Sequence, residues 1–346
     1  MPSLPHPMPP PKKKSRVMIL ATGGTIAGTA PANHPNGYVP GKLPMDAMIN
    51  AIPGIHDLTD IQWRQVAGIG SQDMTFSLMA HLANQIGALF ESDTADGVVV
   101  PHGTDTVEET AYFLNLVVKS SKPVVLTGAM RPFFTLSSDG PRNLFSAVAV
   151  AADAKAVDRG VLVVMNDQIH GARSVQKCHT LDVAAFTSRT CGLMGAICGD
   201  CLAGNAIRYF RRPFRKHTHQ SEFSVSPDLL FPRVDILYAC ADMPGDLIDG
   251  AVERGARGIV IAGVGNGNMN DHTIRRAAAA VQKGVAVVRS SHVGAGCVLR
   301  NVEIDDDAMG FVVANDLPPS KARILLMLAL MKNHRPDQIQ ALFDTY

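Results

Sequence analysis

The sequence lacks the marks of several classes of protein. None of its apolar runs reaches the ~18 residues that a membrane-spanning helix needs. Six cysteines are too few for a disulfide-built scaffold in a chain of 346 residues. With 32 basic and 31 acidic side chains the net charge is +1, which gives no electrostatic footprint for nucleic acid. These absences exclude a membrane and a nucleic acid as expected partners and leave an ordinary globular protein.

We also expect no export signal at the start of the sequence. The segment MPSLPHPMPPPKKKSR is rich in proline and then in lysine, and the apolar run after it, Val17 to Ala21, is too short for a signal peptide. We therefore predict a disordered tail over residues 1–15 and a cytoplasmic protein. A periplasmic protein with an unrecognised leader stays open as the alternative.

What the sequence does contain is a regular alternation of strands and helices. Short β-branched runs, such as 17–21, 123–127 and 160–165, alternate with segments of helical periodicity such as 74–90. This order predicts an α/β fold whose larger, N-terminal domain is a doubly wound, mostly parallel sheet with helices on both faces. The rhythm restarts at Val234, which predicts a second, smaller C-terminal α/β domain. The expected parts are a catalytic domain over 16–209, a linker over 210–232 and the second domain over 233–346.

The stretch DGVVVPHGTDTVEETAYFL, from Asp96 to Leu114, predicts a strand, a tight turn and the start of a helix. Open α/β sheets bind ligands at such turns because the first N–H groups of the helix gather there. Thr104 and Asp105 lie in the turn, and an alcohol beside a carboxylate suits a nucleophile and its orienting group. The simpler alternative is that both residues cap the helix. Thr106 and Glu109 also have the spacing of a capping box.

A second strand-then-turn, LATGGTIAG, carries a hydroxyl at its tip in Thr25. A phosphate-binding loop would need a lysine after Gly28, where the chain has Thr29, and the glycines lack the spacing of a dinucleotide fingerprint. The loop that follows, 29–43, is long enough for a lid. Its only aromatic residue, Tyr38, could reach back to Thr25 or simply pack within the loop.

Further segments hold polar residues whose role the local pattern leaves open. Ser71 fits either a helix start or a contact to a small ligand, Lys177 lies in a polar stretch, and Glu303 lies in an acidic stretch typical of a solvated turn. The linker begins with RRPFRKH, a basic cluster that is weak evidence for nucleic acid. Cys198 and Cys201 lack the further ligands of a structural zinc site, so we expect free thiols and no metal.

Eight segments together resemble the bacterial L-asparaginases of the type II-like group. They follow that family's order between residues 17 and 346, and the combination of TGGTIAG with HGTDT is highly specific to it. The matching segments are LATGGTIAG (20–28), GSQDM (70–74), HGTDTVEETAYFL (102–114), KPVVLTGAMRP (122–132), SSDGPRNL (137–144), RGVLVVMND (159–167), GVGNGN (263–268) and AVVRSS (286–291).

The resemblance implies a role for each candidate residue. The catalytic residues would form two groups: Thr25 as the nucleophile with Tyr38 and Glu303 as its hydrogen-bonded partners, and Thr104 with Lys177 and Asp105. The α-amino and α-carboxylate groups of the substrate would be bound by Ser71, Gln72, Gly103, Thr104 and Asp105, next to a turn that contains Gly24. Asn268 and Glu303 would enter the site from a neighbouring subunit of a homotetramer built from close dimers.

The activity implied by the resemblance is the hydrolysis of L-asparagine to L-aspartate and ammonia through a threonine-bound β-aspartyl ester, with no metal or organic cofactor. Secreted relatives often carry a disulfide at positions that resemble Ser92 and Ser120 here, and the serines agree with a reducing compartment. Three alternatives stay open. They are a glutaminase-asparaginase with comparable activity on L-glutamine, an amidase acting on aminoacyl-tRNA, and a non-catalytic amino-acid sensor on the same fold.

Overall fold

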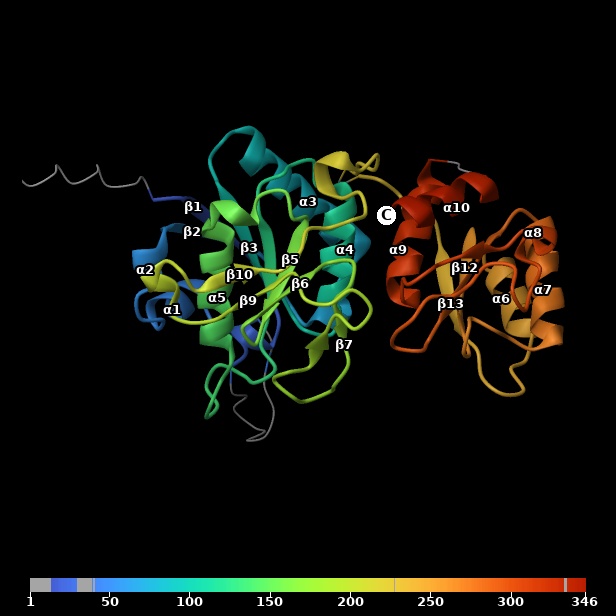
Figure 1. Cartoon of the computed structure of the whole chain (residues 1–346), viewed down its shortest axis with the longest axis horizontal. Helices are drawn as coiled ribbons and strands as arrows, with labels where there is room; N and C mark the ends of the chain where they lie inside the picture. Colours follow the sequence, from blue (N-terminus) through green and yellow to red (C-terminus); the bar gives the residue numbers. More distant parts are fainter. Residues whose placement is uncertain (1–13, 30–38, 40, 227, 333–334) are drawn as a thin grey trace, which may run out of the picture.

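The computed structural model describes residues 14–29, 39, 41–226, 228–332 and 335–346, so that Tyr38 and most of the predicted tail lie outside the described residues. Two parts of the chain lie side by side along the long axis of the molecule, the N-terminal one in blue to yellow and the C-terminal one in orange and red (Figure 1). Within the described residues, no helix combines the length and the apolar character needed to cross a membrane.

The larger part is built on an eight-stranded sheet. Its first five strands along the chain pair parallel to one another, which confirms the mostly parallel sheet. The remaining strands extend one edge in antiparallel order, which the sequence analysis did not predict. Across the sheet the strands are β10 (Ile207–Tyr209), β9 (Gly195–Ile197), β6 (Gln168–Gly171), β5 (Val161–Met165), β4 (Val124–Thr127), β3 (Gly97–Pro101), β1 (Arg16–Gly23) and β2 (Asp60–Ile69).

Both faces of this sheet are buried, as the alternation of side chains along β1 shows. Met18 and Leu20 belong to one hydrophobic core, whereas Val17 and Ile19 belong to another. Helices α3 (Phe76–Glu91) and α4 (Val107–Val117) cover the first face. The second face is covered by α1 (Met45–Asn50), α2 (Ile55–Leu58) and α5 (Gly140–Ala152). The doubly wound architecture is therefore confirmed.

The smaller part is a four-stranded parallel sheet. One face packs on α6 (Asp246–Glu253) and α7 (Asp271–Gln282), and the other packs on α9 (Pro319–Met331). Because α9 also contacts α4, one hydrophobic core runs across both parts of the chain (Figure 1). The remaining elements of this part are β11 (Val234–Tyr238), β12 (Gly258–Gly263), β13 (Ala286–Ser291), β14 (Val312–Val313), α8 (Asp306–Met309) and α10 (Pro336–Thr345).

Several short elements complete the chain. A two-stranded ribbon follows the large sheet, and single turns of 3-10 helix occur after β1, after β2 and in the second half of the N-terminal part. The ribbon consists of β7 (Gln176–Lys177) and β8 (Phe186–Thr187), and the turns are η1 (Thr25–Ala27), η2 (Ser71–Asp73), η3 (Ala154–Ala156), η4 (Cys201–Ala203) and η5 (Thr218–Gln220). Cys201 begins η4, and Cys198 is an exposed free thiol.

The predicted capping box at the start of α4 is wrong. Thr106 is the N-cap residue, but its side chain makes no capping hydrogen bond. The Thr106 hydroxyl donates instead to the backbone oxygen of Ser71 at 2.7 Å. At the start of α3 the capping residue is Thr75, whose side chain accepts from the Leu78 N–H at 3.2 Å. Tertiary contact with the neighbouring turn therefore takes the place of local capping at α4.

Candidate active site

The candidate site lies where the strand order of the large sheet reverses. The chain goes from β1 to β2 on one side and then returns to β3 on the other side of β1. The carboxyl ends of these parallel strands meet at one edge of the sheet, and ligands of open α/β sheets bind at such a switch point. The turns that leave β1, β2 and β3 carry Thr25, Ser71 and Thr104, so the fold brings three of the predicted site residues to one edge.

Glycines allow these turns to touch. A Cβ added to Gly24, which has φ +82°, would lie 2.4 Å from the Cα atom and the nitrogen of Gly103. A Cβ added to Gly103 would lie 2.6 Å from the Ser71 hydroxyl oxygen. Only glycine leaves room for backbones this close. Gly24 and Gly103 are therefore required by the contact between the turns.

The two threonines each follow one of the touching glycines. Thr25 is 8% exposed and Thr104 is 6% exposed. The turn after β4 closes over the second of them, because a Cβ on Gly128 would lie 3.0 Å from the Thr104 methyl group. Both threonines are thus largely desolvated, and an electrostatic interaction is stronger in such surroundings than in water. Thr104 does not cap α4, so that alternative is wrong.

Lys177 joins the site from β7. Its Nζ atom donates to the Thr104 hydroxyl at 2.9 Å and to the Asp105 carboxylate at 2.6 Å. The Lys177 side chain is 18% exposed, whereas the Asp105 side chain is 61% exposed. The Asp105 N–H donates to the Ser71 hydroxyl at 3.1 Å. A lysine that looked solitary in the sequence is therefore the centre of a hydroxyl–ammonium–carboxylate cluster.

Gln72 completes the predicted substrate-binding group of this turn. A Cβ on Gly70 would lie 2.4 Å from the Gln72 amide nitrogen, which places the Gln72 amide directly over the glycine. The same nitrogen donates to the Asp73 carboxylate at 3.4 Å, and the Gln72 side chain is exposed. The amide and carboxylate of this turn are available to polar groups of a small ligand.

The backbone of Lys177 is held by residues that sequence reasoning missed. The Lys177 N–H donates to the Glu108 carboxylate at 3.0 Å, and Ser320 of α9 donates to the other Glu108 oxygen at 3.3 Å.

Lys321 is fully buried, and its Nζ donates to the carbonyl oxygens of Ala172 at 2.8 Å, Arg173 at 3.1 Å and Val175. Burial lowers the pKa of Lys321 to about 8. A lysine within the apolar run of α9 was the available signal.

His102 holds the backbone of the turn that follows β3. It is fully buried, and burial lowers its pKa from 6.5 to about 4. Its Nδ1 atom is 2.7 Å from the Gly103 carbonyl oxygen, so Nδ1 carries the hydrogen, and Nε2 accepts from Thr110 at 2.9 Å. The neutral ring thus fixes the turn and does not serve as an acid at neutral pH.

Asn268 and Glu303 lie in the smaller part, apart from this cluster. The Asn268 amide donates to the Glu303 carboxylate at 2.6 Å, and Asn266 donates to the same oxygen at 3.4 Å. Glu303 is exposed. Among the residues that the structure describes, no hydrogen bond or ion pair links Asn268 or Glu303 to the three turns. One chain alone does not bring all predicted site residues together, and Tyr38 lies outside the described residues.

This arrangement offers hydroxyl, ammonium and carboxylate chemistry. No group of three or more His, Cys, Asp or Glu side chains suited to a metal ion occurs in the described part of the chain. A buried alcohol bonded to an ammonium group, with a second buried alcohol in an adjoining turn, suits nucleophilic attack on a carbonyl carbon. Nearby N–H groups are available for the oxyanion.

Comparison with known proteins identifies relatives along almost the whole chain. Residues 16–214 match the family model "Asparaginase, N-terminal", and residues 233–343 match "Glutaminase/Asparaginase C-terminal domain". L-asparaginase 2 of Escherichia coli is 45% identical over 95% of this chain and 93% of its own. The glutaminase-asparaginase of Acinetobacter glutaminasificans is 42% identical over 96% of this chain and 100% of its own. A crystal structure of the probable cytoplasmic L-asparaginase from Campylobacter jejuni superposes with a TM-score of 0.91 at 45% identity, covering 96% of this chain and 100% of that one.

Proposed function

The chain belongs to the asparaginase/glutaminase family, and on that premise we propose that it is an amidohydrolase that converts L-asparagine to L-aspartate and ammonia. The observation that carries this proposal is the contact of Lys177 with Thr104 and Asp105, beside the turn that holds Thr25, at the switch point of the sheet. The reaction needs no metal or organic cofactor.

In the first half of the reaction, the Thr25 hydroxyl oxygen attacks the carbon of the substrate's side-chain amide. The new C–O bond replaces the C–N bond, the hydroxyl proton passes to the nitrogen, and ammonia leaves. In the second half, water attacks the resulting β-aspartyl ester and restores the threonine. A neutral alcohol is a weak nucleophile, so each half needs a group that accepts a proton.

The proposal gives an electrostatic role to the cluster of Thr104, Lys177 and Asp105. Lys177 donates to the Thr104 oxygen in the resting state, so it accepts a proton only after losing its own. Thr104 is therefore the group through which the lysine acts, and Thr25 makes the first attack. Backbone N–H groups of the turn over 102–105 would stabilise the oxyanion, and such donors commonly contribute several kcal/mol.

The second proposed element is a site shared between subunits of a homotetramer built from close dimers. Asn268 and Glu303 would complete the site of a neighbouring copy, where Glu303 would lie near Thr25 together with Tyr38. This proposal is supported by the exposure of Glu303 and by its bonding to Asn268 and Asn266 alone among the described residues.

Preference for L-asparagine over L-glutamine is the finer part of the proposal. The two substrates differ by one methylene, and a pocket discriminates one methylene by about 1–3 kcal/mol. Gln72 and Asn268 favour the asparagine-preferring members, whereas glutaminase-asparaginases among the relatives keep a comparable glutaminase activity open. We also propose a cytoplasmic location, with the periplasm as the alternative.

The test is ammonia release from L-asparagine and from L-glutamine, measured side by side on the purified protein. Fast release from asparagine and slow release from glutamine supports the proposal. Comparable rates would make the protein a glutaminase-asparaginase. Binding of L-aspartate without ammonia release from either amide would identify a non-catalytic sensor and overturn the proposed reaction.

A further inference from the structure

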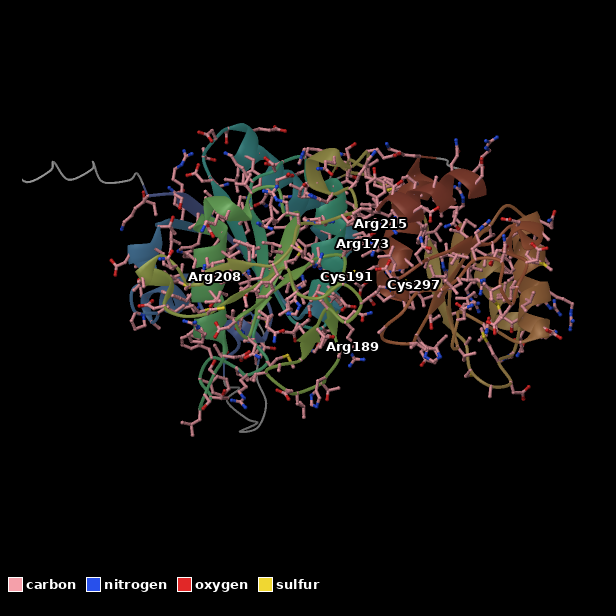
Figure 2. The ribbon with its side chains drawn as sticks, viewed as in Figure 1. Arg173, Arg189, Cys191, Arg208, Arg215 and Cys297 are labelled. Atoms are coloured by element: carbon pink, nitrogen blue, oxygen red, sulfur yellow. The ribbon has the colours of Figure 1, made fainter. Side chains whose placement is uncertain are left out.

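The basic segment RRPFRKH, at 211–217, has no place in the proposed reaction. The structure folds it over a cavity of about 240 Å³ at the junction of the two parts of the chain. Figure 2 labels Arg173, Arg215, Cys191 and Cys297 at this junction. None of the proposed catalytic or substrate-binding residues that the structure describes lines the cavity, so it is separate from the candidate active site.

The cavity has an excess of positive charge. Five of its lining residues are arginine or lysine, and the only carboxylate among the described lining residues is Asp316. That carboxylate is already engaged, because it accepts from Arg173 at 2.5 Å. Arg215 is half-buried, and its side chain makes no hydrogen bond or ion pair with any residue that the structure describes. The remaining cations are Arg159, Arg211 and Lys216.

Two arginines that line the cavity each have a buried guanidinium nitrogen with no acceptor among the described residues. Arg173 donates through Nε to Tyr346 and through Nη1 to Asp316, but within the described structure its buried Nη2 has no partner. Arg211 donates through Nη2 to Gly192 at 2.9 Å, whereas its buried Nε likewise has none among the described residues. Buried N–H donors are normally paired, so each of these two arginines has hydrogen-bonding capacity that the described residues do not use.

The rest of the wall is apolar. Val161, Ala172 and Met194 are at most 2% exposed and form part of the lining, together with the ring of Pro213. An anion with no apolar body would leave this surface unused. The cavity lies a little below the ~300–1,000 Å³ range of ordinary small-molecule sites, so it suits a small ligand.

We propose that this cavity binds a small organic anion, a carboxylate on an apolar body, with the carboxylate at the arginines and the body against the apolar wall. Guanidinium groups remain charged at any ordinary pH and match the planar carboxylate geometrically. The proposal does not depend on the proposed enzyme activity, because binding is measured without substrate.

Two cysteines in the cavity lining can report on ligand binding. Cys191 and Cys297 line the cavity, whereas Cys178, Cys198 and Cys240 are exposed thiols elsewhere on the chain. The experiment follows the rate at which iodoacetamide alkylates each cysteine of the full-length protein, resolved by peptide mass spectrometry. Benzoate is the probe, benzamide supplies the same body without charge, and inorganic phosphate supplies charge without the body.

We expect benzoate to slow the alkylation of Cys191 and Cys297 about tenfold at roughly ten times its dissociation constant, because about one tenth of the sites are then empty. The three other thiols should react at unchanged rates, and benzamide and phosphate should protect weakly or not at all. Cys178 follows Lys177 in the sequence, so slowed reaction there instead would place benzoate at the active site and overturn the proposal.

A matched pair of variants tests the role of the arginines. Arg215→Met should weaken benzoate binding at least about tenfold, as expected for the loss of a hydrogen bond to a charged group. Arg212→Met is the control, since Arg212 is exposed and lies 3.8 Å from Asp158, outside the cavity. Equal effects of the two variants would contradict the proposal. If Arg215→Met does not fold, the protection pattern of the unaltered protein still decides.

Other outcomes also contradict the proposal. Equal protection by benzamide would show a site for apolar groups without a role for charge, and equal protection by phosphate would show a site without a role for the apolar wall. If Cys191 and Cys297 resist alkylation without ligand and become reactive on dilution, a second copy of the chain covers the cavity. If no probe slows the alkylation of Cys191 and Cys297, the proposal is wrong.

Discussion

The two regions that carry the predicted site residues differ in how completely one chain builds them. In the turn region, Thr104, Lys177, Asp105 and Ser71 are joined by short hydrogen bonds, and both threonines are more than nine-tenths buried. In the C-terminal region, Glu303 is exposed and bonds only to neighbouring asparagines among the described residues. One chain builds the first region by itself, whereas the exposure of Glu303 in the second region fits the proposed site shared between subunits.

The largest expected effect comes from removing the hydroxyl groups of Thr25 and Thr104. Thr25→Ala and Thr104→Val should each fold and bind L-aspartate but lose about 10³-fold or more in kcat, as removal of a nucleophile does. Ammonia release and aspartate titration measure the two properties. Activity above a few per cent in either variant would remove that threonine from the mechanism.

Acid should affect the turn region through His102. The folded protein holds its pKa near 4, against 6.5 for a free histidine, so the unfolded chain binds a proton more readily. Stability should therefore be unchanged by this group above about pH 7 and should fall by about 3 kcal/mol as the pH drops from 6.5 to 4. Urea unfolding at pH 7, 5 and 4 measures it.

His102→Gln is the matched variant for that measurement, because its amide can still donate and accept. The variant should lose less stability between pH 7 and pH 4 than the unaltered protein does. An identical loss in both proteins would show that other groups cause the acid sensitivity.

Co-expression of two variants tests directly whether the two regions form one site across subunits. Glu303→Gln alone should reduce kcat roughly 10²-fold, in the range of a lost acid–base group, and should change stability little because the side chain is exposed. Co-expression with Thr104→Val should restore activity if sites are shared. With random pairing in a symmetric dimer, about a quarter of the sites then contain both native residues. The absence of any recovery would place both residues in the site of one chain.

The smallest expected effect concerns Lys321, which connects α9 to the segment that leads to Lys177. Lys321→Met leaves the carbonyls of Ala172, Arg173 and Val175 without their donor, so the segment leading to Lys177 should shift. We expect about a tenfold loss in kcat, since misplacement by a fraction of an ångström is costly.

Lys332→Met, at the far end of the same helix, is the control for Lys321→Met. Lys332 donates to Glu222 and lies away from the lysine-bearing segment. Equal kinetic effects of the two variants would reduce Lys321 to a general stabilising residue.

The sequence predicted the parts of this molecule that depend on local pattern. The strand at 17–21 and the helix at 74–90 follow from runs and periodicity, and the structure has them as Arg16–Gly23 and Phe76–Glu91. The alternation of strand and helix was sufficient for the doubly wound sheet. By contrast, β2 was not assigned, because its alternating polar residues lie at an exposed edge of the sheet and show no apolar run.

The site was predictable to the extent that its residues lie in turns after strands. Thr104 and Asp105 could be singled out from the strand–turn–helix pattern, but capping and chemistry could not be distinguished there. The ion pair of Asp105 with Lys177 joins residues 72 positions apart, and only the fold shows it. The contact of Gly24 with Gly103 is likewise visible only in the fold, because no local sequence pattern indicates a contact between two turns.

The burial of Lys321 has a consequence for how the protein is made. The ribosome completes Ala172 149 positions before the lysine that binds its carbonyl oxygen. At usual rates of synthesis that interval lasts roughly 7–30 s, during which the N-terminal half can begin to fold as a unit. The nascent chain then carries its threonines and Lys177 without the anchor of α9. The segment that leads to Lys177 is thus held by Lys321 only after α9 has been synthesised, late in translation.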